Sequence, residues 1–296
     1  MTASATASLS LGGLEFAVVS DEEVLPPEDA AYRAFWNPRP GPAGPDAIRV
    51  SISISDTPTA AGRTIFENNA HWSIQAEGRA RTFVDRDASG PVLAVRFQPG
   101  APEVTVECSP AWRMDDRART LRCPVRYPVD QILSMYLLGA RGILLHAAGM
   151  VVNGRAVVLA GVSGAGKTTL SRLAAGRPGW EFLSDDRVIV RLPDGSREAR
   201  AHGTPWAGEG RIAANESAPL ARLVFLSQAE SNDVRFLAAR EAATRLMAMA
   251  SIPWYDAERV GYSLEACDRL LERVPTALLA FRPDAGAVEA VERLLD

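Results

Sequence analysis

Hydrophobic and polar residues alternate along short runs in the first part of the chain. The alternation is clearest around Val50, Ile52 and Ile54, which would share one face of a strand. Such runs recur about every ten residues, a spacing typical of an antiparallel β-rich domain. They predict strands at residues 14–20, 47–55, 71–77, 80–85, 91–98 and 103–108. We therefore expect residues 1–125 to form an antiparallel β-rich N-terminal domain. Three tryptophans are expected in its core: Trp36, Trp72 and Trp112.

The pattern changes in the second part of the chain. Residues 127–142 carry apolar side chains at helical spacing, and two apolar strands follow on either side of Asn153-Gly154. Both turn residues tolerate a positive φ, which predicts a tight antiparallel hairpin. The remaining predicted strands are 181–184, 187–192, 221–227 and 233–238, and the remaining helices are 167–175, 240–250, 263–273 and 287–295. Residues 126–296 are thus expected to form a mixed-sheet domain, which makes the chain α/β (α+β).

Composition restricts the class of protein. Of the 296 residues, 47% are hydrophobic and 23% are charged, as in a globular protein with a substantial core. The net charge of −4 gives no global attraction to nucleic acid or to an anionic membrane, so we expect neither partner. No apolar run reaches the roughly 18–20 residues of a membrane span, and the first residues lack the features of a signal peptide. Cys108, Cys123 and Cys267 show no paired spacing, which argues against a disulfide framework or a zinc site. A cytoplasmic location is expected.

Among the 32 basic residues only one is a lysine, Lys167. It lies in the pattern Gly-x-x-x-x-Gly-Lys-Thr between a predicted strand and a predicted helix, the context of a phosphate-binding loop. Glycines let backbone N–H groups surround an anion, and the helix directs its positive end toward it. An ammonium group can reach between β- and γ-phosphates, where a planar guanidinium does not fit. The hydroxyl of Thr168 can bind Mg²⁺. The motif therefore predicts a nucleoside triphosphate bound together with Mg²⁺. The predicted nucleotide-binding residues are Gly161, Val162, Ser163, Gly164, Ala165, Gly166, Lys167, Thr168 and Thr169.

Two flanking features are candidates for the chemistry of phosphate transfer. Transfer to an alcohol needs a metal anchor and a carboxylate that accepts the hydroxyl proton. Asp185 and Asp186 follow a predicted strand and should point in different directions, so that one can serve the metal and one the acceptor. The alternative is a solvated turn. His146 lies on the neighbouring strand of the hairpin and could approach the phosphates; its alternative is a core position.

Together these residues resemble HPr kinase/phosphorylase, a bacterial protein-serine kinase related in fold to phosphoenolpyruvate carboxykinase. The resemblance covers roughly residues 142–190 and depends on the histidine, the phosphate-binding loop and the Asp-Asp pair. It implies a mixed-sheet P-loop domain in which Lys167 contacts the phosphates. It also implies that Asp186 accepts the proton, that Thr168 binds the Mg²⁺, and that His146 lies near the transferred phosphate.

The segment after the aspartates departs from that family. Where the family carries a Glu-Ile-Arg-Gly-Leu-Gly signature, residues 201–211 read AHGTPWAGEGR. This looks like stand-alone relatives from bacterial gene clusters, some serving modification of ribosomally made peptides, which share the GTPW stretch. Glu209 is the nearest candidate for a metal-binding carboxylate, and Arg211 for a cation on the phosphates. His202 and Trp206 are candidates for the acceptor pocket. A purely structural loop is the alternative for all four.

The expected function is an ATP- and Mg²⁺-dependent kinase that phosphorylates a serine or threonine of a peptide or protein. Lys167, Asp186, His146 and Arg211 would be its catalytic residues, and Thr168, Asp185 and Glu209 would serve the metal. Two alternatives stay open: a kinase for a small-molecule alcohol, and a nucleotide-binding regulatory module without turnover. Reverse phosphorolysis is disfavoured by the altered segment. The family's enzymes are hexamers, so a homo-oligomer is possible.

Overall fold

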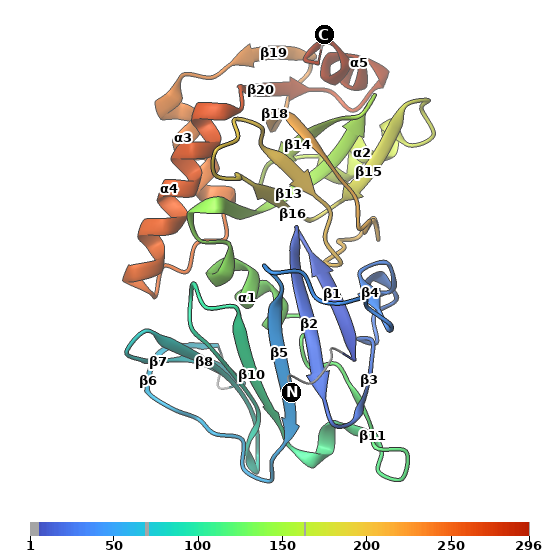
Figure 1. Ribbon diagram of the computed structural model, residues 1–296. Coiled ribbons are helices and arrows are strands. Elements are labelled where there is room, and N and C mark those ends of the chain that lie inside the picture. Colours follow the sequence, from blue (N-terminus) through green and yellow to red (C-terminus); the bar gives the residue numbers. More distant parts are fainter. Residues whose placement is uncertain (1–5, 69–70, 163, 296) are drawn as a thin grey trace. The chain divides into compact units, whose positions relative to one another are not determined.

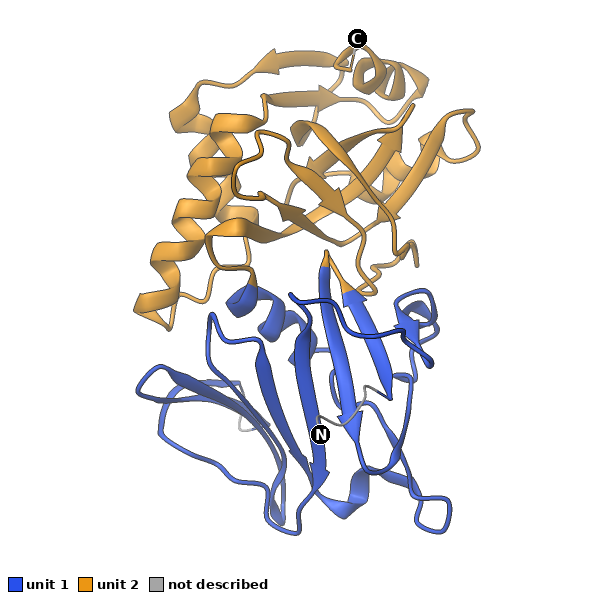
Figure 2. Ribbon diagram, in the orientation of Figure 1, with its two compact units in different colours: residues 1–10, 14–137 blue, residues 11–13, 138–296 orange. Residues whose placement is uncertain are grey.

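The computed structural model describes residues 6–68, 71–162 and 164–295 (Figure 1). The chain divides into two compact units, one made of residues 1–10 and 14–137 and the other of residues 11–13 and 138–296 (Figure 2). Both units combine large sheets with helices, which confirms the α+β fold class. The domain boundary at residues 125–126 stays a prediction.

The first unit is built around one large sheet. Among the described residues this sheet has nine strands in the order β4-β1-β2-β5-β10-β9-β8-β7-β6, and a small sheet has the order β11-β12-β3. The strands are β1 (Ala7–Leu11), β2 (Leu14–Ser20), β3 (Glu23–Leu25), β4 (Trp36–Asn37), β5 (Ile48–Ile54), β6 (Arg63–Asn68), β7 (Trp72–Glu77), β8 (Ala80–Asp87), β9 (Gly90–Phe97), β10 (Glu103–Cys108), β11 (Arg113–Asp115) and β12 (Thr120–Arg122). Short helices are η1 (Ala30–Ala34), η2 (Pro110–Trp112) and α1 (Val129–Leu138).

The sequence predicts an antiparallel sheet, but the large sheet is mixed. β6 to β10 form an antiparallel meander, but β5 pairs in parallel with both β2 and β10. The segments between these parallel partners are long, and parallel strands require such crossover connections rather than tight turns. Alternation within each strand indicates which face is buried, but it does not indicate strand direction.

The prediction of a tryptophan core in the first unit is wrong. Its largest fully buried side chains include phenylalanines: Phe16, Phe35, Phe83 and Phe97. All three tryptophans are only partly buried. Trp36 is on the edge strand β4, and the guanidinium of Arg126 lies 5.3 Å from the ring centre of Trp112. Large amphipathic rings thus sit at the borders of the core, where one side of the ring stays accessible.

The second unit contains the sheet that carries the phosphate-binding loop. Its strand order is β14-β13-β16-β17-β18-β20-β19, with β15 beside β13 and an additional parallel pairing of β14 with β18. The strands are β13 (Gly142–Val152), β14 (Arg155–Ala160), β15 (Trp180–Ser184), β16 (Arg187–Arg191), β17 (Arg200–His202), β18 (Ser217–Gln228), β19 (Asp233–Phe236) and β20 (Thr276–Phe281). The helices are η3 (Gly139–Arg141), α2 (Lys167–Ala174), α3 (Ala239–Met249), α4 (Ala257–Arg273) and α5 (Ala285–Arg293).

Helices cover this sheet on two faces (Figure 1). Ala156, Val158 and Ala160 of β14 pack with apolar residues of α3 and α4. The alternate residues Val157 and Leu159 pack with those of α2 and α5. Burial on both faces explains why β14 is a continuous apolar run instead of an alternating one.

The predicted hairpin before the phosphate-binding loop is confirmed. β13 and β14 pair antiparallel from Ala147–Ala160 to Val152–Arg155, and both turn residues, Asn153 and Gly154, have positive φ. Other elements differ from the prediction. α4 begins at Ala257 rather than at residue 263, and the strands that were not predicted are β1, β3, β4, β6, β11, β12, β17 and β20. The three cysteines are buried and free. Within the described residues, no helix is long and apolar enough to cross a membrane.

Candidate active site

The phosphate-binding loop joins the end of β14 to the start of α2. We call residues 161–166 the phosphate loop; Ser163, a predicted nucleotide-binding residue, lies outside the described residues. Gly166 has a φ of 103°, and a Cβ there would lie 2.5 Å from Cζ of Phe281 on β20. Glycine is therefore required both by the backbone conformation and by the close approach of an aromatic ring. The loop is thus folded tightly against the end of the parallel strands.

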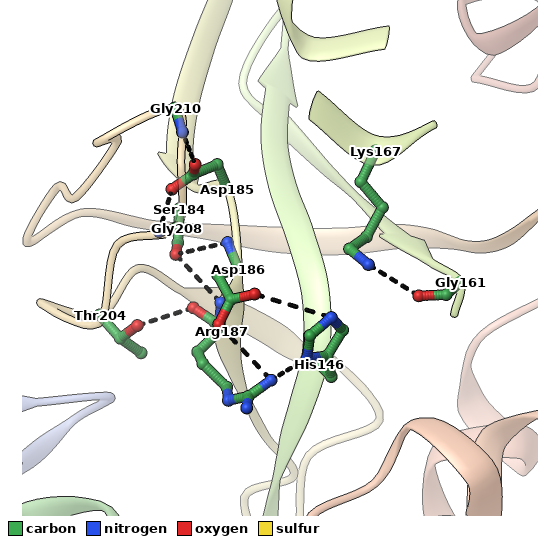
Figure 3. Close-up of polar contacts among 10 residues, drawn as sticks. All are labelled: His146, Gly161, Lys167, Ser184, Asp185, Asp186, Arg187, Thr204, Gly208 and Gly210. Carbon is green, nitrogen blue, oxygen red and sulfur yellow. Dashed lines mark hydrogen bonds and ion pairs between the residues drawn. The ribbon is translucent and has the colours of Figure 1, made fainter. Parts of the chain in front are cut away.

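Lys167 begins α2, and its ammonium group points back over the loop. Nζ donates a hydrogen bond of 2.7 Å to the carbonyl oxygen of Gly161, and the side chain is buried (Figure 3). Burial lowers the pKa of Lys167 from its ordinary value; the charge of Asp186 opposes this shift and that of Arg187 adds to it. A positive charge that is partly shielded from water attracts an anionic ligand more strongly than an exposed one does.

One cavity of about 450 Å³ brings most of the predicted site residues together. It lies in the second unit and receives side chains from β13, the phosphate loop, α2, the turn after β15 and the loop that follows β17. Its lining residues are His146, Gly164, Gly166, Lys167, Thr168, Thr169, Arg172, Asp185, Asp186, Gly208, Glu209 and Gln228. Lys167 and Asp186, the two residues most important to the expected chemistry, face the same space.

Asp185 is buried and holds the loop opposite it in place. Its carboxylate accepts N–H bonds from Gly208 at 2.9 Å and from Gly210 at 2.5 Å (Figure 3). It also accepts one from Ile212 at 3.2 Å. We call residues 207–212 the GEG loop. A Cβ on Gly210 would lie 2.6 Å from Oδ2 of Asp185, so a glycine is needed where the carboxylate approaches the backbone. This arrangement presents Glu209 at the cavity, exposed to solvent.

Asp186 points in a different direction from Asp185, as the sequence predicted (Figure 3). Its Oδ1 lies 3.6 Å from Nε2 of His146, and its Oδ2 lies 3.5 Å from the guanidinium of Arg187. His146 and Arg187 are themselves cross-strand partners in the pairing of β13 with β16, and the guanidinium bonds to Nδ1 of the imidazole. The side chain of Asp186 is 31% exposed, so a ligand in the cavity can reach it.

The contact with Arg187 determines the tautomer of His146. A guanidinium has only donors, so Nδ1 must accept and the proton of the neutral ring resides on Nε2, facing Asp186. Burial lowers the pKa of His146, and the charges of Lys167 and Arg187 lower it further, against the opposing effect of Asp186. The lowered pKa favours the neutral ring, which presents an N–H group toward the carboxylate.

The remaining predicted residues differ in where they lie. Val162 is exposed and lines a neighbouring cavity together with Gly161 and Ala165. Arg211 is exposed, adopts a φ of 53°, and is not among the described residues that line the site cavity. The expectation that it reaches the phosphates therefore finds no support in this geometry.

Of the two candidates for the acceptor pocket, Trp206 is buried and His202 is partly buried. Trp206 is only 6% exposed. Burial, with the charges of Arg191 and Arg200, lowers the pKa of His202 to about 4. Neither residue lines the described site cavity, and both are better explained as supports of the segment that leads into the GEG loop.

The three predicted metal ligands, Thr168, Asp185 and Glu209, all line the cavity, and their role in metal binding stays a prediction. Among the residues that the structure describes, no three His, Cys, Asp or Glu side chains form a metal-binding group. Mg²⁺ in phosphate-transfer sites usually takes one or two carboxylates and completes its shell with phosphate oxygens and water. Three N–H groups already occupy the oxygens of Asp185, so Glu209 is the more accessible carboxylate.

Three residues of the site were missed in the sequence: Arg172 and Gln228, which line the cavity, and Arg187, which contacts His146 and Asp186. Arg172 is one helical turn beyond Thr168, a spacing that should have indicated the same face of α2. Gln228 ends β18, the parallel neighbour of β14, and its amide donates a 2.7 Å hydrogen bond to the carbonyl oxygen of Gly164. Arg187 could not be found without the register of β13 and β16.

Comparison with known proteins gives two findings. A family model described as "SynChlorMet cassette protein ScmC" matches residues 129–273, a little under half of the chain. Among solved structures, the chain is similar to the Hpr(Ser) kinase/phosphatase from Coxiella burnetii, with a TM-score of 0.30 and 12% identity over 51% of this chain and 87% of that one. This is a weak structural resemblance. No curated protein matches. The function proposed below therefore depends on the geometry of the site.

Proposed function

We propose that the second unit is an ATP- and Mg²⁺-dependent phosphotransferase that acts on a serine or threonine hydroxyl of a peptide or protein. The observation that carries the proposal is the shared cavity of Lys167 and Asp186, a phosphate-binding cation and an accessible carboxylate. A protein that only binds nucleotide needs the first group but not the second.

In the proposed reaction the phosphate loop and Lys167 hold the β- and γ-phosphates. Asp186 takes the proton from the acceptor hydroxyl as the hydroxyl oxygen forms a bond to the γ-phosphorus. The bond between that phosphorus and the oxygen bridging to the β-phosphate breaks, and ADP leaves. The products are ADP and a phosphorylated acceptor, with the proton first on Asp186 and then released to solvent.

His146 and Arg187 keep Asp186 in position for this role. The imidazole presents Nε2–H toward one carboxylate oxygen, and the guanidinium lies beside the other. Since His146 lines the cavity itself, its N–H can also reach a phosphate oxygen.

Thr168 and Glu209 would hold the metal, and Asp185 would hold the loop that carries Glu209. Bound Mg²⁺ would supply charge neutralisation at the phosphates. The chain's own contribution is to hold Glu209 at the cavity through three backbone N–H bonds to Asp185.

The test is phosphate transfer by the purified chain. It is incubated with Mg²⁺-ATP and candidate acceptor peptides, and phosphopeptides and ADP are measured by mass spectrometry and chromatography. We expect phosphoserine or phosphothreonine to form in proportion to ADP, and to disappear with EDTA or in Asp186→Asn. Phosphate on a small-molecule alcohol but on no peptide would support the first alternative. ATP binding without ADP formation, whatever the acceptor, would support the second and refute the proposed reaction.

A further inference from the structure

A second cavity, of about 530 Å³, lies beside the phosphate loop in the same unit. We propose that it receives the nucleoside, base and ribose, of the nucleoside triphosphate whose phosphates occupy the site cavity. The inference rests on the proposed function, because it assumes that the phosphate loop binds a nucleotide. It adds the part of the site that would distinguish a nucleotide from a bare polyphosphate.

The two cavities meet at the phosphate loop. Gly164 and Gln228 line both of them, and the hydrogen bond from the Gln228 amide to the Gly164 carbonyl oxygen lies at this junction. A molecule whose anionic end is at Lys167 can therefore extend past Gly164 into the second cavity. The size falls within the roughly 300–1,000 Å³ of small-molecule sites.

The walls of the second cavity suit an uncharged ring system. They come from the ends of β14 and β18 and from one side of α3. These walls include Ala160, Phe225, Leu226, Arg245, Ala248 and Met249. Apolar walls with a few polar groups are typical of sites that bind flat heterocycles.

Arg245 is the one charged side chain among the described lining residues, and it is held in place. Its guanidinium bonds to Glu241 at 3.1 Å, and Glu241 also accepts two hydrogen bonds from Arg235, at 2.8 and 2.9 Å. Those bonds from Arg235 are the main reason why the pKa of Glu241 falls to about 2, so the carboxylate stays charged. A guanidinium held at one edge can stack on an aromatic base or donate to ribose hydroxyls.

A nucleoside fits this cavity better than an acceptor does. The acceptor hydroxyl must reach Asp186, and neither Asp186, His146 nor Lys167 lines the second cavity. Its occupant therefore sits away from the reacting atoms and shares only the phosphate loop with them. That is the position of the part of ATP that does not react.

The test compares two ligands by titration calorimetry on the full chain with Mg²⁺: ATP, and inorganic tripolyphosphate, which has no nucleoside. Ala248→Trp fills the cavity from an exposed helix position. We expect its affinity for ATP to fall at least tenfold while its affinity for tripolyphosphate is unchanged. Met247→Trp is the matched control, because Met247 is the adjacent exposed residue and does not line the described cavity; it should leave both affinities unchanged.

Arg245→Gln provides a second variant that does not add bulk. It should weaken ATP severalfold and leave tripolyphosphate binding as it was. If both cavity variants bind ATP like the wild type, or lose ATP and tripolyphosphate equally, the inference is wrong and the phosphotransferase proposal stands. If the variants instead keep ATP affinity but raise the KM of a peptide acceptor, the cavity belongs to the acceptor. If the wild type binds no ATP, the proposed function and this inference both fail.

Discussion

The phosphate loop and the GEG loop line the same cavity but are held together in different ways. The phosphate loop is closed by near neighbours in sequence: Lys167 bonds to Gly161, and the Ala165 N–H bonds to the Val162 carbonyl oxygen. The GEG loop is held by Asp185, which lies 23 to 27 residues before the three N–H groups it binds. A short motif therefore encodes the first loop, whereas the second forms only when distant segments have folded.

The same contrast separates the two adjacent aspartates. Asp185 is turned toward the GEG loop and is 3% exposed, while Asp186 is turned toward His146 and remains accessible. Adjacent residues of one type can thus divide the work of assembly and chemistry, because successive side chains at a strand end point in different directions. The following substitutions test whether these assignments hold.

Asp186→Asn should have the largest effect. The amide keeps the shape of the side chain but cannot accept the proton, and a general base usually contributes about 10²–10⁴ in rate. We expect kcat for phosphate transfer to fall by that range while ATP affinity, measured by calorimetry, stays near that of the wild type. Phosphate transfer at the wild-type rate would remove Asp186 from the role of base.

Lys167→Arg should have the next largest effect. The guanidinium keeps the charge but is too wide for the space between the β- and γ-phosphates, and loss of one such group typically costs about 10²–10³ in kcat. Arg172→Lys is the control, since it exchanges the same two residue types at an exposed position of the same cavity. Steady-state rates of ADP formation should separate the two variants by at least tenfold. Similar rates would show that position 167 needs only a positive charge.

The sequence predicts those parts of the molecule whose contacts are local. The hairpin at Asn153-Gly154, the phosphate loop and the divergence of the two aspartates all follow from turn chemistry, a compact motif or strand geometry. The parallel pairing of β5 with β2 and β10 did not follow, because alternation is the same in either direction. The role of Arg187 could not be predicted for a similar reason. Arg187 lies beside His146 only because of the register between β13 and β16, which the sequence does not reveal.

The GEG loop was predicted only in part. Glu209 is the acidic residue of the segment 201–211, which identifies it as a metal candidate, and it does line the cavity. The glycines on either side of it were given no role, although they are what allows Asp185 to approach the backbone. The charge of Arg211 suggests a phosphate contact, but its backbone is left-handed and its exposed side chain does not belong to the described cavity lining.

Gly210→Ala tests the long-range loop directly. The new Cβ would lie 2.6 Å from Oδ2 of Asp185, so the loop must shift and weaken at least one of its three hydrogen bonds. We expect the free energy of unfolding to fall by about 1–3 kcal/mol and the Mg²⁺ concentration for half-maximal transfer to rise several times. Urea denaturation and a Mg²⁺ titration measure these effects. Gly261→Ala is the control, because a Cβ on Gly261 in α4 meets no atom within 4 Å and alanine favours a helix.

Arg187→Gln should have the smallest effect and a distinctive one. Without the guanidinium, His146 loses a nearby positive charge and the donor to Nδ1, so its pKa rises toward the ordinary value of about 6.5. At a given acidic pH more of the imidazole is then protonated, and a positive ring beside Asp186 weakens the carboxylate as a base. The acidic limb of the kcat profile should therefore move to higher pH, with a severalfold loss near pH 6 and little change near pH 8.

The histidine itself supplies the control for this shift. In a His146→Asn background there is no imidazole to titrate, so adding Arg187→Gln should leave the acidic limb where His146→Asn alone puts it. Arg187→Lys should lie close to the wild type, since it keeps a positive charge beside the ring. Arg187→Gln could instead move the acidic limb of the kcat–pH profile equally with and without His146. Arg187 would then act directly on Asp186 or on the phosphates, and not through the pKa of His146.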